Sequence, residues 1–166
     1  MANPSIEFSS LIYGSLVNSL LETADEVDEV NSKLDEIGWR IGLRLAHEFA
    51  RDRTLERVDT PEKIINDLII KNWVNITGSK NAVQCTETKK SQYLLTFEQS
   101  IFTQNVTIPE RYNGLKYTAV LPGIIRGIFE IYHFEAKVYL KEKSTKTEVI
   151  VEIVKEIPIA VPKDDN

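Results

Sequence analysis

The stretch that decides the fold runs from residue 27 to residue 49 and reads VDEVNSKLDEIGWRIGLRLAHEF. Its apolar side chains recur at steps of three and four residues, which is the spacing of one face of an α-helix. They are Val27, Val30, Leu34, Ile37, Ile41, Leu45 and Phe49. The stretch therefore predicts a long amphipathic helix of about six turns.

Two glycines lie inside this predicted helix. Gly38 and Gly42 are four residues apart, beside the apolar stripe. A glycine in a helix interior costs about 1 kcal/mol relative to alanine. We therefore expect another helix backbone to approach closely at these two positions.

Two further helices are predicted in the first half of the chain. The apolar residues between Phe8 and Leu20 recur at helical steps. The sequence Thr60-Pro61-Glu62 is typical of a helix start, because threonine caps free amides, proline fits the first turn and glutamate suits the positive end of the dipole. The apolar face of this helix consists of Ile64, Ile65, Leu68, Ile69 and Trp73.

The second half of the chain alternates apolar and polar residues, as strands do. Residues 93–97 predict a strand with 101–108 as its candidate partner, and residues 136–153 predict a hairpin. A helical pattern over 112–132 contains Pro122, which either kinks the helix or marks its start. The fold class is therefore α+β, with a helical layer packed on a small antiparallel sheet. We expect one domain over 1–166, with an extended tail over 158–166.

Composition excludes several classes of protein. The chain has 166 residues, a net charge of −5 and one cysteine. The acidic balance argues against nucleic-acid binding, and a single cysteine excludes a disulfide framework or a multi-cysteine zinc site. Neither His47 nor His133 has metal-ligand spacing, and no phosphate-binding loop or nucleotide fingerprint is present. We expect no catalytic residue, metal or cofactor. With no signal sequence, we expect an intracellular protein.

The predicted helices carry more apolar surface than a small sheet can cover. Oligomerisation is one reading of this surplus, and an internal channel for an apolar ligand is the other. Acidic residues between Glu22 and Glu36 precede a run of arginines from Arg40 to Arg57. This order complements a helix dipole, but it also fits a docking surface for a protein or an anionic membrane.

Three motifs resemble the small subunits of the transport protein particle (TRAPP). They are Leu11–Val17 with Tyr13-Gly14 at its centre, the glycine-containing stretch 30–49, and the Gly-x-x-Arg-Gly pattern in 122–130. The resemblance covers residues 8–157, although Pro122 departs from it. It implies a non-catalytic scaffold subunit whose helices mediate dimerisation. Such subunits build a particle that tethers vesicles in ER-to-Golgi transport and supports nucleotide exchange on a Rab-type GTPase. The alternative is a lipid-binding sensor module of the same superfamily.

The resemblance also implies specific sites and partners. The predicted subunit interface consists of Leu11, Tyr13, Gly14, Val17, Ile37, Gly38, Ile41 and Gly42. On this view Gly38→Leu blocks pairing without unfolding the sheet. The predicted GTPase-facing tail consists of Ile159, Val161, Lys163 and Asp164. The expected partners are other TRAPP small subunits, as a homodimer or heterodimer, and a Rab-type GTPase through the assembled complex, with peripheral contact at Golgi or ER membranes.

Related subunits carry an acylated cysteine, and Val58 stands at the matching position here. We therefore expect no thioester-linked acyl chain. A channel lined by Val58, Ile64, Ile65 and Leu68 remains an alternative, filled by side chains or by a free lipid.

Overall fold

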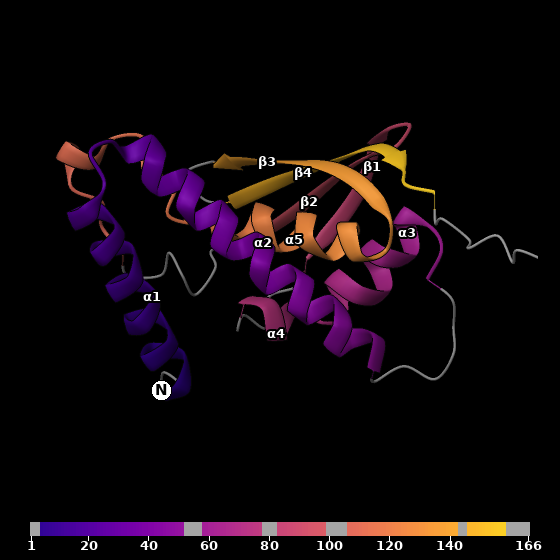
Figure 1. Ribbon diagram of the computed structural model, residues 1–166, viewed down its shortest axis with the longest axis horizontal. Coiled ribbons are helices and arrows are strands. Elements are labelled where there is room, and N and C mark those ends of the chain that lie inside the picture. Colours follow the sequence, from indigo (N-terminus) through magenta and orange to yellow (C-terminus); the bar gives the residue numbers. More distant parts are fainter. Residues whose placement is uncertain (1–3, 52–57, 78–82, 99–105, 143–145, 159–166) are drawn as a thin grey trace, which may run out of the picture.

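A computed structural model describes residues 4–51, 58–77, 83–98, 106–142 and 146–158. Helices cover one face of a four-stranded antiparallel sheet, as Figure 1 shows. The α+β fold class predicted from the sequence is confirmed.

The first two predicted helices are present. Helix α1 spans Pro4–Thr23, and helix α2 spans Val27–Arg51. The buried side of α2 is formed by Val30, Leu34, Gly38, Gly42, Ala46 and Phe49. Its first turn is acidic and its last turn basic, so both ends suit the helix dipole.

The third predicted helix begins where expected but winds differently. The Thr60 hydroxyl accepts a hydrogen bond from the Lys63 amide (3.3 Å) and so caps α3, Pro61–Lys63. The chain continues as the π-helix η1, Ile64–Ile70, and then as α4, Trp73–Thr77. Four apolar side chains of η1 are fully buried, namely Ile64, Ile65, Leu68 and Ile69.

The sheet has the strand order β1-β2-β4-β3. Its strands are β1 (Gln84–Lys89), β2 (Gln92–Glu98), β3 (Phe134–Glu142) and β4 (Lys146–Glu156). The hairpin prediction is confirmed in β3 and β4. The proposed partner of β2 is wrong, because β2 pairs with β1 and β4. Residues 106–108 are not in a strand, and 101–105 lie outside the described residues. Strand β1 has the polar sequence QCTETK, so no apolar alternation reveals it.

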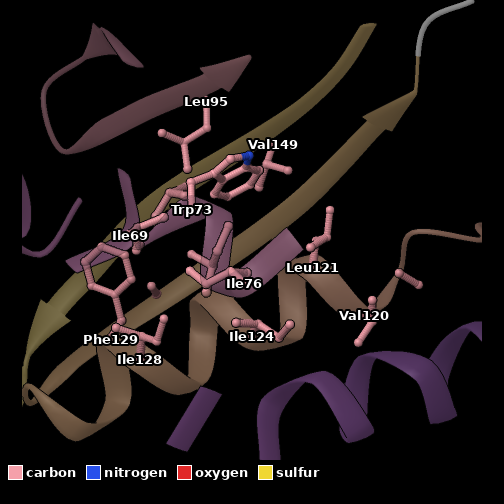
Figure 2. Packing of buried hydrophobic residues seen from close by; sticks show 14 of the residues in the cluster. Ile69, Trp73, Ile76, Leu95, Val120, Leu121, Ile124, Ile128, Phe129 and Val149 are labelled. Carbon is pink, nitrogen blue, oxygen red and sulfur yellow. The ribbon is translucent and has the colours of Figure 1, made fainter. Parts of the chain in front are cut away.

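Helix α5 lies between α2 and the sheet. It spans Val120–Ile131, after a single 3-10 turn, η2, at Glu110–Tyr112. Pro122 therefore lies in the first turn of α5, where the missing amide leaves no hydrogen bond unmade, so it marks the helix start. Figure 2 shows Leu121 and Phe129 of α5 packed in one core with Trp73 and with Leu95 of β2.

A candidate subunit interface

The backbones of α2 and α5 are in contact. A Cβ atom added to Gly38 would lie 2.1 Å from the carbonyl oxygen of Val120, and one added to Gly42 would lie 2.1 Å from that of Ile124. Real Cβ atoms do not approach backbone this closely, so any side chain here would force the helices apart.

The contact is reciprocal, because α5 also presents glycines to α2. A Cβ on Gly123 would lie 2.0 Å from the Asp35 carbonyl oxygen, and one on Gly127 would lie 2.4 Å from that of Trp39. We call these four glycines and the backbone they meet the α2–α5 seam.

The predicted close helix contact at Gly38 and Gly42 is therefore present, but it lies within one chain. Both residues are buried by α5, so a second subunit cannot use them, and their assignment to the subunit interface is corrected. Helical spacing shows that a backbone approaches but not which chain supplies it. A Gly38→Leu change would act on the fold of the single chain.

Two polar contacts flank the seam. Nη2 of Arg126 lies 2.5 Å from Oδ2 of Asp35, and the indole N–H of Trp39 donates to Glu130 (2.7 Å). Partial burial raises the pKa of Asp35, and the Arg126 guanidinium offsets part of that rise. Sequence reasoning missed both pairs, because their partners are more than ninety residues apart.

Helix α1 is attached through Tyr13 and Val17, which are buried. The Tyr13 hydroxyl donates to the carbonyl oxygen of Tyr117 (2.5 Å), and the two rings meet edge to face at 5.2 Å. Burial raises the pKa of Tyr13, which keeps its hydroxyl a donor. Gly14 lies beside the same ring, since an added Cβ would lie 3.3 Å from the Tyr117 hydroxyl.

Segment 114–117 holds α1 to α2. The amide of the Asn31 side chain donates to the carbonyl of Gly114 (3.0 Å), and its oxygen accepts from the backbone amide of Lys116 (2.8 Å). Asn31 thus fixes the segment that carries Tyr117, which in turn binds Tyr13.

The opposite side of α1 is apolar and uncovered by the rest of the described chain. Phe8, Leu11 and Ile12 are 64%, 72% and 55% exposed, and we call them the α1 apolar face. Figure 1 shows α1 standing apart from the sheet. On α2, Ile41 is also exposed and Ile37 is half-buried. Of the predicted interface residues, Leu11 and Ile41 are thus accessible, while Tyr13 and Val17 face their own chain.

The other predicted sites lie elsewhere. Ile64, Ile65 and Leu68 have no exposed surface, and Val58 packs half-buried against the same core. The tail residues Ile159, Val161, Lys163 and Asp164 lie outside the described residues.

Among the described residues, the other groups that could bear chemistry are Cys85 and the His, Asp and Glu side chains. Cys85 lies in β1, and burial together with Glu87 raises the pKa of its thiol, which disfavours the reactive thiolate. Over the described ranges, no group of His, Cys, Asp and Glu could hold a metal ion, and no helix is long and apolar enough to cross a membrane.

These features describe a small α+β protein whose first helix exposes three large apolar side chains. The family model "Transport protein particle (TRAPP) component" matches residues 9–155, and the chain belongs to this family. It is 28% identical to trafficking protein particle complex subunit 3 of Dictyostelium discoideum, over 79% of this chain and 71% of that protein. It is 26% identical to the subunit 3 homolog of Caenorhabditis briggsae, over 98% of this chain and 91% of that protein.

A solved structure has the same fold. It is the crystal structure of a trafficking protein particle complex subunit 3 from Naegleria fowleri, covalently bound to palmitic acid. The TM-score is 0.78 at 21% identity, over 93% of this chain and 98% of that chain.

Proposed function

We propose that this chain is a structural subunit of a TRAPP-type particle and that it pairs with another small subunit through the α1 apolar face. The observation that carries the proposal is the division of α1 into two sides. Tyr13 and Val17 anchor one side to the chain, while Phe8, Leu11 and Ile12 are exposed on the other. An apolar patch of this kind is typical of an association surface.

Burial of this face supplies the driving force. Each large apolar side chain contributes about 1.5–3 kcal/mol when it is fully buried. Ile41, 39% exposed on α2, extends the surface in this proposal. The partner is another TRAPP small subunit, identical or different.

The proposed role of the particle is supported by the names of the relatives. The curated relatives are named as trafficking protein particle complex subunits, and we propose that this chain serves vesicle tethering in ER-to-Golgi transport at the cytoplasmic surface of those membranes. Rab-type nucleotide exchange would be a property of the assembled particle, with the tail 159–166 as the GTPase-facing element. The chain itself would be a non-catalytic scaffold.

The test is a substitution that leaves the fold intact. Leu11→Asp places a charge at a position that is 72% exposed, so the single chain should fold normally. Co-expression with a TRAPP small subunit from the same organism, followed by light scattering on the purified complex, should show loss of pairing. Val154→Asp, also at an exposed apolar position, is the matched control and should pair normally. If the Leu11→Asp variant pairs as strongly as the unaltered chain, the α1 apolar face is not the interface.

We also propose that this chain carries no thioester-linked acyl group. The Naegleria protein holds palmitic acid covalently, whereas Val58 has no thiol to form such a bond. Fully buried Ile64, Ile65 and Leu68 pack the region predicted as a channel. The intact mass of the protein purified from its source should therefore equal the peptide mass, and native mass spectrometry should show no bound lipid. A stoichiometric apolar ligand would favour the alternative of a lipid-binding module.

A further inference from the structure

Strand β3 forms one edge of the sheet (Figure 1). In the part of the chain that the structure describes, it pairs with β4 alone, along its whole length from Phe134 to Glu142. An edge strand leaves alternate backbone N–H and C=O groups unpaired, and these groups can pair with another strand. The edge of β3 is therefore a site at which a further strand could be added.

The helical layer leaves room beside this edge. A groove of about 350 Å³ lies between α2, the start of α5 and β3. Its lining residues on β3 are Val138, Tyr139 and Leu140. Val138 and Leu140 are half-buried, while their partners on β4, Val151 and Val149, are fully buried. The core thus covers the start of β3, where Phe134 and Ala136 are buried, but leaves Val138 and Leu140 partly exposed.

The solvent side of β3 carries a charge pattern that is complementary to itself. Glu135, Lys137, Tyr139 and Lys141 alternate with inward-facing residues. If β3 pairs antiparallel with β3 of a second copy, centred on Val138, Glu135 of each copy lies opposite Lys141 of the other. The same register overlaps the full strand and places Lys137 opposite Tyr139. Opposite charges at directly paired positions stabilise a sheet.

The proposed pairing also extends the cross-strand pairs of opposite charge that are already present within each sheet. Within one chain, Lys155 binds Glu135 across the strands (3.1 Å), and Lys141 lies opposite Glu148. Across the joined sheets, one row would read Lys155, Glu135, Lys141 and Glu148, alternating in sign. A shift that centres the pair on Tyr139 would set Lys137 against Lys141 twice, which is repulsive.

We propose that a second copy of this chain binds at the β3 edge, in the register centred on Val138, and that the two sheets form one continuous antiparallel sheet. On the helical side, Val138 meets its own counterpart and Ala136 meets Leu140. This self-association uses a surface separate from the α1 apolar face and does not depend on the proposed function.

The test is a charge swap, measured by sedimentation equilibrium in the Leu11→Asp background so that the α1 apolar face does not contribute. Between the two copies, Glu135→Lys and Lys141→Glu each replace two attractive pairs by two repulsive ones. Each should weaken the dimer by about tenfold, and the double variant should restore it. Glu87→Lys makes the same charge change on β1, the opposite edge strand, and should leave the dimer unaltered.

A second measurement checks the register. Zero-length carbodiimide coupling of a mixture of unlabelled and isotope-labelled chains should join Glu135 of one copy to Lys141 of the other. A Leu11→Asp chain that stays monomeric at every concentration would overturn the proposal, and so would a double variant as weak as the single ones. Neither result would affect pairing through α1, which is measured separately with a second TRAPP subunit.

Discussion

Helices α1 and α2 both carry glycine within an apolar helical pattern, but the surroundings of these glycines differ. At the α2–α5 seam, backbone meets backbone, and any side chain at Gly38 or Gly42 would overlap it. On α1, Gly14 meets only the hydroxyl of the Tyr117 side chain, and the outer face of the helix is exposed. The seam is closed within the chain, whereas α1 leaves Phe8, Leu11 and Ile12 exposed.

The largest expected effect is at the seam. Gly38→Ala should reduce the free energy of unfolding by about 3 kcal/mol, because the added methyl group overlaps the Val120 carbonyl and separates two helices. Gly14→Ala is the matched control. It should stay within about 1 kcal/mol of the unaltered chain, since alanine gains helix propensity and the hydroxyl it meets is on a side chain. Urea unfolding of both variants measures the difference, and equal losses would contradict the distinction.

The next effect is confined to α1. Tyr13→Phe removes the hydrogen bond to the Tyr117 carbonyl and leaves that oxygen without its donor, which should cost about 1–2 kcal/mol. Hydrogen exchange followed by mass spectrometry should show faster exchange in α1 and unaltered exchange in α5. Equal acceleration in both helices would mean that α1 and the seam unfold as one unit.

A third variant acts where the helical layer meets the sheet. The Tyr93 hydroxyl donates to Glu62 and holds the pKa of that carboxylate below its ordinary value. The stability from this contact is therefore present above the unfolded-state pKa of Glu62 and is lost as the pH falls through its folded-state pKa. Tyr93→Phe should lose about 1 kcal/mol at neutral pH, and the difference from the unaltered chain should shrink as the pH falls below the ordinary glutamate pKa of about 4.3. Urea titrations at several pH values test this. A stability difference that is independent of pH would show that the Glu62 carboxylate does not contribute to the effect of Tyr93.

The smallest expected effect is on the α1 apolar face. Leu11→Asp should change the free energy of unfolding by no more than about 0.5 kcal/mol, because the side chain is exposed in the single chain. The thermal midpoint of the dilute protein measures this. A large loss of stability would show that Leu11 packs within its own chain.

Sequence periodicity predicted much of the fold and little of the site. The apolar steps of α2 and the alternation of β3 and β4 identify elements because each buries one face. The sequence did not predict strand β1 or the π-helical winding at Ile64–Ile70. Strand β1 has no apolar alternation, and the apolar residues of 64–70 fit an ordinary α-helix as well as a π-helix. The contacts of Asp35 and Trp39 with α5 also depend on distant chain segments.

The sequence by itself determined the α+β class, the long glycine-containing helix and its membership of a recognisable family, because these follow from local spacing and motif. Only the tertiary structure decided which surfaces the chain closes for itself. Gly38 and Gly42 are covered by α5, while Leu11 stays exposed, although all three lie on or beside apolar helical stripes. The physical reason is that hydrophobic spacing specifies the need for burial but not the partner, and the partner is set by how the whole chain packs.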